Sequence, residues 1–311
     1  MKLFSGTSNF PLSEKIAKAL HVFISPLEIH VFPDGERRVR VMEEVVGEDC
    51  IVVESTGMPV DQNYIELLLI TDALKRSGAK SVCAVIPYMG YARQDHVFRS
   101  GEARSFAVMV KMLEGAGVDK AVVCDLHSIK IPELFKIPVK HISALPLFVE
   151  RIKEICSRSR RSDAQDLQGL DSILVSPDMG GVRRIKLLSE MLSGMSYTSV
   201  VKNRDLSTGE ISADALQGEV KERAFIVDDM ISTGGTIVQA AEVLYKRGAR
   251  EIFVFATHGV LSEHASEILQ NSALQKVFLT DSIDVPKNKQ FAKLEILSIA
   301  QIIVKEIGDV L

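Results

Sequence analysis

The sequence predicts an α/β protein made of two similar halves, each a mostly parallel β-sheet flanked by helices. Apolar runs typical of buried strands alternate with segments of helical periodicity along the 311-residue chain. A chain of 311 residues suits two ordinary domains better than one. Three sequence blocks recur in the same order in both halves, which indicates a duplication.

The predicted strands share consecutive apolar residues, as expected where helices cover both faces of a sheet. They are Cys50–Glu54, Val82–Ile86, Ala121–Cys124, Ile173–Ser176, Phe225–Val227 and Ile252–Phe255. Between them, helical periodicity predicts helices over Tyr64–Ser77 and Thr236–Arg247. Each of these helices ends beside a glycine, Gly78 or Gly248, a common stop signal.

The duplication rests on three pairs of segments. Residues 73–88 (ALKRSGAKSVCAVIPY) align with 243–258, 3–20 (LFSGTSNFPLSEKIAKAL) with 174–191, and 141–152 (HISALPLFVERI) with the segment around Ser298. Chance similarity explains one such block, but three in one order favour a repeated unit. We therefore expect domains at 1–144 and 145–311. The polar stretch 157–169 reads as a surface loop, with a basic binding patch as the alternative.

Composition excludes several classes of protein. The net charge of −4 provides no global basic field for nucleic acid. No apolar run reaches the roughly 18 residues of a membrane span, and the N-terminus lacks the apolar core of a signal peptide. Four cysteines without a CxxC pair favour a reducing, cytoplasmic location.

The stretch VDDMISTGGT (227–236) follows an apolar run and precedes a predicted helix. Glycines and backbone N–H groups at a helix start bind phosphate, and Thr233 and Thr236 add hydroxyls. Asp228 and Asp229 come earlier, at the strand end, so they would accept hydrogen bonds from hydroxyls of the same ligand. A sugar phosphate meets both needs, whereas an exposed acidic strand end with an ordinary helix cap is the alternative.

Other polar motifs also follow strand-like runs, where α/β sheets place ligands. Each has an exposed turn, a structural histidine or a surface basic pair as its alternative. They are FPDGE (32–36), PYMGYARQD (87–95), DLHS (125–128), SPDMGG (176–181) and the pair Lys202 and Arg204 in VVKNR (200–204).

Taken together, and in this order, the motifs resemble those of the ribose-phosphate diphosphokinase family, whose members carry a duplicated phosphoribosyltransferase-like fold. The resemblance runs from about residue 3 to the C-terminus. It implies transfer of the diphosphoryl group of ATP to O1 of ribose 5-phosphate, with release of AMP.

The resemblance also implies a role for each motif. Phe32 would stack on adenine, and the other predicted ATP-binding residues are Asp34, Gly35, Glu36, Arg93, Gln94, Asp95 and Arg99. Asp228 and Asp229 would hold the ribose hydroxyls, and the 5-phosphate would lie in the loop of Ser232, Thr233, Gly234, Gly235 and Thr236. His127 and Asp178 would hold Mg²⁺, and Lys202 and Arg204 would act on the transferring group. The segment 96–105 matches a loop over ATP.

In this family the FPDGE loop enters the site of a neighbouring subunit, so the resemblance implies a homo-oligomer with a shared active site. Two features resemble archaeal-type members: Ser232, where many members have Asp, and the GEA of 101–103. The segment VVGEDC (45–50) lacks an Arg that often accompanies an ADP and phosphate regulatory site. A phosphoribosyltransferase and a noncatalytic associated subunit are the competing hypotheses.

Overall fold

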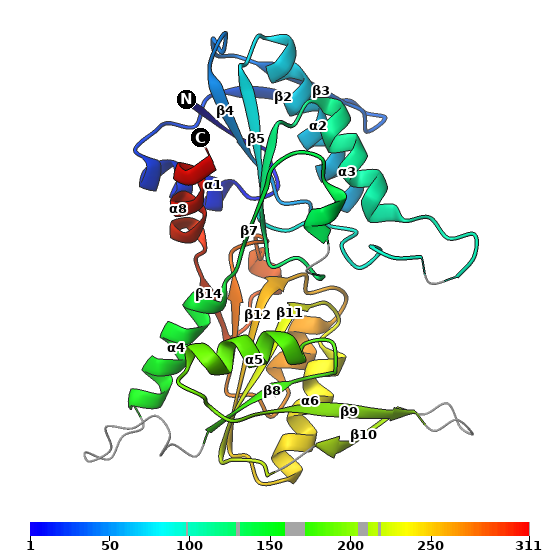
Figure 1. Ribbon diagram of the computed structural model, residues 1–311, viewed down its shortest axis with the longest axis vertical. Coiled ribbons are helices and arrows are strands. Elements are labelled where there is room, and N and C mark those ends of the chain that lie inside the picture. Colours follow the sequence, from blue (N-terminus) through cyan, green and yellow to red (C-terminus); the bar gives the residue numbers. More distant parts are fainter. Residues whose placement is uncertain (98, 129–130, 159–171, 205–210, 217–218, 311) are drawn as a thin grey trace. The chain divides into compact units, whose positions relative to one another are not determined.

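The computed structural model describes residues 1–311 apart from 98, 129–130, 159–171, 205–210, 217–218 and 311 (Figure 1). At 158, 201–204, 211–216 and 309–310 it describes the backbone but not the side chains. The chain divides into a first unit, Met1–Ser143 with Asp281–Asp284 and Ser298–Leu311, and a second unit, Ala144–Thr280 with Val285–Leu297. Most of the predicted loop at 157–169 lies outside the described residues.

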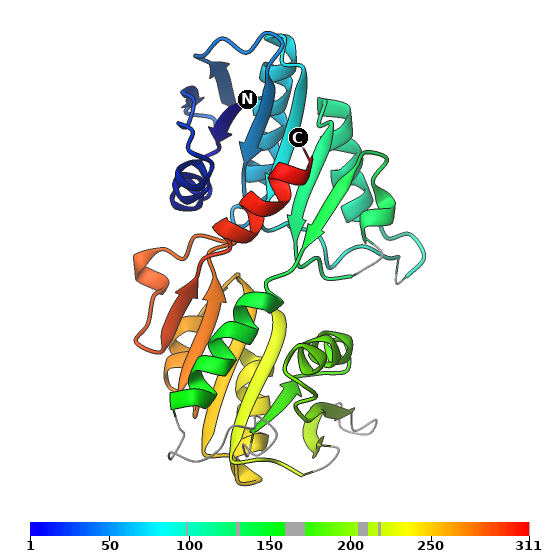
Figure 2. The same ribbon diagram turned by 60° about the vertical axis from the view of Figure 1, so that its left-hand side comes forward.

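The first unit is built on a five-stranded parallel sheet in the order β1-β4-β5-β6-β7. Its strands are β1 (Lys2–Ser5), β4 (Asp49–Val53), β5 (Ser81–Ile86), β6 (Lys120–Cys124) and β7 (Val139–Ile142). Helices α1 (Phe10–Leu20) and α8 (Ala300–Val310) cover one face, and α2 (Val60–Arg76) and α3 (Ser105–Ala116) cover the other (Figure 2). An antiparallel hairpin of β2 (Leu27–Val31) and β3 (Arg37–Val41) packs against α2, and a 3₁₀ turn spans Ile131–Leu134.

The second unit contains a seven-stranded sheet in the order β10-β9-β8-β11-β12-β13-β14. Its strands are β8 (Ser172–Ser176), β9 (Tyr197–Arg204), β10 (Ile211–Leu216), β11 (Arg223–Ile231), β12 (Glu251–Gly259), β13 (Lys276–Thr280) and β14 (Leu294–Leu297). Among the described strands of this sheet, only β10 runs antiparallel to its neighbour. Helices α4 (Leu145–Arg158) and α5 (Val182–Met191) lie on one face, and α6 (Gly235–Lys246) and α7 (Ala265–Gln270) lie on the other (Figure 2). A 3₁₀ turn spans Lys287–Lys289.

The strand orders confirm the predicted duplication. The order β1-β4-β5-β6-β7 recurs as β8-β11-β12-β13-β14, and the hairpin β2–β3 recurs as β9–β10. The last helix of each repeat packs in the other unit: α4 contacts α5, while α8 contacts α1, β6 and β7. The predicted ranges 1–144 and 145–311 stay a prediction, and the compact units differ from them at the returning C-terminal segments.

Continuous burial explains why the central strands are continuously apolar. In β4, Cys50–Val53 are buried, and in β11 the whole of Arg223–Val227 is buried. Phe255 stacks on Phe278 with ring centroids 4.6 Å apart, an arrangement that contributes about 0.5–1.5 kcal/mol beyond area burial. All four cysteines are buried and free, as expected for the first three.

The predicted strands and helices recur, some with longer bounds and others shifted by one residue, as where the helix predicted at Thr236–Arg247 is Gly235–Lys246. β11 continues past Val227 to Ile231, and β12 continues past Phe255 to Gly259, because the two strands pair in parallel as far as Ile231 and Gly259. Of the helices in the described part of the chain, none has both the length and the apolar character that a bilayer crossing requires.

Candidate active site

The predicted ribose 5-phosphate loop joins the end of β11 to the start of α6 in the second unit. Gly234 is the N-cap of α6 and adopts the left-handed conformation at φ +81°, which suits glycine. A Cβ at Gly234 would also lie 3.4 Å from Leu269 Cγ. The loop therefore presents the N-terminus of a 12-residue helix, where backbone N–H groups and the helix dipole favour an anion.

The loop is held in place by the segment that follows β12. Ser262 donates its backbone N–H to the carbonyl of Ser232 at 3.1 Å. The two hydroxyls, Ser232 Oγ and Ser262 Oγ, are 3.0 Å apart. Thr233 is exposed, while Gly235 and Thr236 are half-buried. The side chain at 232 thus has a hydroxyl partner within its own unit.

Asp228 and Asp229 lie inside β11 rather than beyond it, because the strand continues to Ile231. The Oδ1 atom of Asp228 accepts from the N–H of Asp229 at 2.9 Å, and Oδ1 of Asp229 accepts from the N–H of Met230 at 2.9 Å. Burial, reinforced by the charge of Asp229, raises the pKa of Asp228 to about 8. Two adjacent carboxylates in a poorly hydrated place call for hydroxyl donors or a cation.

Arg184 is a functional candidate that the sequence reasoning missed. Its Nη1 lies 3.6 Å from Asp228 Oδ1 and 3.9 Å from Asp229 Oδ1, and its side chain is 17% exposed. Its charge opposes the rise in the pKa of Asp228. Its position three residues after the SPDMGG motif was the available signal, but only the packing of α5 beside β11 shows which residues Arg184 contacts.

Asp178 starts the turn between β8 and α5. Its Oδ1 accepts from the N–H groups of Gly180 at 2.9 Å and Gly181 at 3.3 Å. A Cβ at Gly181 would lie 2.5 Å from Ser176 Oγ, so this tight turn requires glycine. The SPDMGG motif therefore has a local structural role as well as the predicted one.

Lys202 and Arg204 lie on β9, so the segment is extended. Their side chains lie outside what the structure describes.

The FPDGE motif forms the turn of the β2–β3 hairpin in the first unit. Gly35 adopts φ +93° and donates its N–H to the carbonyl of Phe32 at 2.9 Å. Asp34 Oδ1 accepts from the N–H of Glu36 at 3.1 Å. The Phe32 ring packs edge-on against His30 at 4.7 Å, has Arg38 Cζ over it at 5.9 Å from its centroid, and is 36% exposed.

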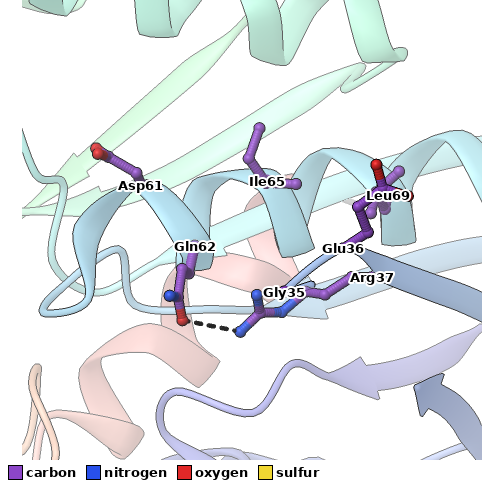
Figure 3. A pocket seen from close by; sticks show the side chains of 7 residues that line it. All are labelled: Gly35, Glu36, Arg37, Asp61, Gln62, Ile65 and Leu69. Carbon is purple, nitrogen blue, oxygen red and sulfur yellow. Dashed lines mark hydrogen bonds between the residues drawn. The ribbon is translucent and has the colours of Figure 1, made fainter. Parts of the chain in front are cut away.

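A cavity of about 350 Å³ lies between this hairpin and α2 (Figure 3). The residues lining it come from the turn and from one helix face: Gly35, Glu36, Arg37, Asp61, Gln62, Ile65 and Leu69. Among these residues, Arg37 Nη2 donates to Gln62 Oε1 at 3.2 Å, the hydrogen bond drawn in Figure 3.

The ARQD segment follows β5 in the same unit. Arg93 and Gln94 are exposed, whereas Asp95 is buried and its Oδ1 lies 2.7 Å from His96 Nδ1. Arg104 Nε donates to the carbonyl of Asp95 at 2.6 Å. The turn thus exposes Arg93 and Gln94 to solvent, while the buried Asp95 contacts His96 and Arg104. Arg99 is exposed.

His127 is exposed and follows Asp125, whose carboxylate accepts from Ser143 Oγ at 2.8 Å. His127 belongs to the first unit and Asp178 to the second. Among the described residues, no three His, Cys, Asp or Glu side chains gather as a metal site.

The predicted site residues therefore fall into two groups. In the second unit the structure brings together the acid pair and the loop from Ser232 to Thr236. In the first unit it gives a defined turn for FPDGE and an outward turn for Arg93 and Gln94. The roles predicted for these residues remain predictions.

Family models match both parts of the chain. The N-terminal domain of ribose phosphate pyrophosphokinase matches residues 1–117, and the phosphoribosyl synthetase-associated domain matches residues 208–310.

Individual proteins match along nearly the whole length. The ribose-phosphate pyrophosphokinase of Fusobacterium nucleatum subsp. nucleatum is 38% identical over 311 residues, which is 100% of this chain and 95% of the relative. Ribose-phosphate pyrophosphokinase 1 of Streptococcus agalactiae is 36% identical over 306 residues, 97% of this chain and 91% of the relative. The crystal structure of phosphoribosylpyrophosphate synthetase from Mycobacterium smegmatis superposes with a TM-score of 0.91 at 34% identity, over 99% of this chain and 98% of that one. With this identity along the full chain and the same fold, the protein belongs to the ribose-phosphate pyrophosphokinase family.

Proposed function

We propose that the chain carries out its family's reaction, transfer of the β,γ-diphosphoryl group of ATP to O1 of ribose 5-phosphate, with the acceptor held by β11 and the loop before α6. The observation that carries this proposal is the adjacency of a buried acid pair and a glycine-capped helix start. Such a pair suits ribose hydroxyls, and the helix start suits the 5-phosphate. A simple phosphate site has no use for the two acids.

Asp228 and Asp229 accept hydrogen bonds from ribose hydroxyls, and Arg184 orients both carboxylates from one side. The loop N–H groups and the hydroxyls of Ser232, Thr233 and Thr236 donate to the 5-phosphate. Phe32, Asp34, Gly35 and Glu36 contact the nucleoside, while Arg93, Gln94, Asp95 and Arg99 bind or support the rest of ATP. These contacts fix the direction of the attacking hydroxyl, which supplies much of the acceleration in such transfers.

In the chemical step, O1 of ribose 5-phosphate attacks the β-phosphorus of ATP. The bond from that phosphorus to the oxygen bridging the α-phosphate breaks, AMP leaves with that oxygen, and the O1 proton is released. Lys202 and Arg204 stabilise the charge that moves between the oxygens. Removing one such donor costs about 3 kcal/mol of barrier, which is roughly a hundredfold in rate.

A triphosphate substrate implies a divalent metal, and we assign Mg²⁺. Asp178 and His127 are the proposed protein groups on its side of the site. Carboxylate oxygen fits this hard cation well, whereas imidazole more often binds softer metals, so His127 is the weaker part of the assignment. When bound, the ion would neutralise the phosphates and polarise the phosphorus that is attacked.

We also propose a homo-oligomer in which the FPDGE hairpin of one subunit completes the site of another. The hairpin suits this role because its turn and Phe32 are exposed at the edge of the first unit. Four buried free cysteines favour a cytoplasmic setting. No nucleic-acid partner is proposed.

The proposed chemistry is tested with Lys202→Ala. The variant is expected to lose at least about 100-fold in kcat while its dissociation constant for ribose 5-phosphate, measured by calorimetry, stays within about twofold. Lys246→Ala, at an exposed position near the end of α6, is the matched control. Equal turnover in the Lys202 variant would remove Lys202 from the mechanism.

A further inference from the structure

The strand pairing shows which residues of the two repeats are equivalent. Cys50 in β4 pairs with Lys2 on β1 and Val82 on β5. Ala224 in β11 pairs with Ile173 on β8 and Ile252 on β12. Counting forward along each strand, Glu54 in the first unit occupies the position of Asp228 in the second.

The equivalent positions differ in exposure. The Asp228 side chain is 17% exposed beside the loop that precedes α6, whereas Glu54 is completely buried. A Cβ at position 6 would lie 1.8 Å from Glu54 Oε2, so only glycine leaves room for this side chain. The N–H of Ser8 donates to the same oxygen at 3.5 Å. In the first unit, the Glu54 side chain therefore fills the space between the end of β4 and Gly6.

A second acidic side chain, that of Glu66, also lies beside Gly6. Glu66 of α2 is 1% exposed, and its Oε1 accepts from the Thr7 N–H at 2.6 Å and the Thr7 hydroxyl at 2.7 Å. These donors belong to the loop between β1 and α1, the equivalent of the SPDMGG turn. Glu66 thus occupies both hydrogen-bond donors of Thr7.

The other oxygen of Glu66 reaches the FPDGE hairpin. Oε2 lies 3.2 Å from Nε of Arg37, whose side chain is 13% exposed. The same guanidinium also donates to Gln62 Oε1 at 3.2 Å. Arg37 follows Glu36 directly and lines the cavity behind the turn (Figure 3). A buried ion pair between a planar guanidinium and a fixed carboxylate restricts geometry more than a surface pair does.

We propose that Glu66 and Arg37 are positioning residues for ATP: the buried Glu66, fixed by Thr7, holds Arg37, and Arg37 holds the hairpin that presents FPDGE. This inference rests on the proposed contact of FPDGE with the nucleoside.

The test compares Arg37→Met and Glu66→Gln with Arg40→Met in the full-length protein. Arg40 is on the same strand, is 68% exposed in its side chain and pairs only loosely with Glu28 at 3.8 Å, so it serves as the matched control. KM for ATP, KM for ribose 5-phosphate and kcat are measured, with calorimetric titration of a nonhydrolysable ATP analogue and of ribose 5-phosphate.

The expected result is a rise of about tenfold in KM for ATP and in the analogue's dissociation constant for both variants, with ribose 5-phosphate binding within twofold. The double variant should be little worse than either single variant, because both changes break one network. Arg37→Lys, which keeps the charge opposite Glu66, should recover part of the loss. Arg40→Met should resemble the wild type.

Unchanged ATP affinity in Arg37→Met would overturn the proposal, and so would an equal weakening of the binding of both substrates. If Glu66→Gln does not fold, the ATP affinities of Arg37→Met and Arg37→Lys, which change a more exposed side chain, still test the proposal. If the wild-type chain forms no AMP, the proposed function fails by itself, and analogue binding still tests the hairpin.

Discussion

Three charged side chains show how far single residues determine the acceptor site. Asp228 and Asp229 were predictable as a pair because they are adjacent in a motif. Arg184 could not be predicted, because its contact with the two aspartates depends on how α5 packs beside β11. Ser232 is intermediate: the sequence shows a hydroxyl in the loop, but only the fold shows Ser262 Oγ at 3.0 Å.

The raised pKa of Asp228 predicts a pH dependence of acceptor binding. With a pKa of about 8 in the ligand-free protein, the carboxylate that accepts from ribose hydroxyls becomes the main form only above that pH. Ribose 5-phosphate binding without divalent metal should therefore strengthen by roughly three- to tenfold from pH 7 to pH 9. Calorimetry across this range checks it, with Asp228→Asn expected to bind weakly and show a flat profile. A flat wild-type profile would contradict the assignment.

Arg184 should matter for the acceptor more than for ATP. Arg184→Met removes the cation beside two buried carboxylates, so KM for ribose 5-phosphate should rise by about tenfold, a loss typical of one charged contact. The neighbouring Arg183 is exposed on the same helix, and Arg183→Met is the matched control. Steady-state kinetics with each substrate varied measure the effect; equal changes in both variants would argue against a specific role.

At the scale of elements, alternation of strands and helices was readable from the sequence because buried parallel strands are continuously apolar. The first and last residues of the strands and helices were harder to predict. The predicted strand Phe225–Val227 extends to Ile231 because β12 pairs with it along that length. The sequence also did not show that α4 and α8, the last helices of the two repeats, each pack in the other unit. An amphipathic pattern shows that a helix covers a sheet but not which sheet it covers.

The start of α6 offers a test at this scale. Gly234→Ala would place a side chain at φ +81° and 3.4 Å from Leu269 Cγ, which should cost about 1–2 kcal/mol of stability and weaken ribose 5-phosphate binding. Gly308→Ala in α8 has open space and ordinary helical geometry, so it should stabilise by about 0.5–1 kcal/mol. Denaturant unfolding of both variants compares them. Equal effects would show that the turn geometry at 234 does not matter.

For the whole molecule, the motifs in order predicted the reaction and the duplicated fold, since both depend on local residues and on repetition. The assembly of subunits could not be predicted in this way, because no motif shows which surfaces of two subunits contact each other. The residues predicted to bind ribose 5-phosphate belong to one unit, and the FPDGE hairpin belongs to the other. A site shared between subunits requires each to contribute different parts.

Mixing two inactive variants tests that sharing. Phe32→Ala lacks the proposed adenine contact, and Lys202→Ala lacks the proposed transition-state contact. If one subunit supplies the hairpin for another, co-refolded dimers with random pairing should recover about a quarter of wild-type activity, because half of the dimers carry one intact site. Activity no greater than the sum of the two variants would indicate that each subunit builds its own site.

The central claim concerns which phosphorus is attacked, and ³¹P nuclear magnetic resonance of the full-length chain with ATP, Mg²⁺ and ribose 5-phosphate tests it most directly. The account predicts that the β- and γ-phosphorus signals of ATP reappear as a diphosphate on C1 of the sugar, with one AMP formed for each. Formation of ADP, or no AMP from folded protein with both substrates present, would contradict it.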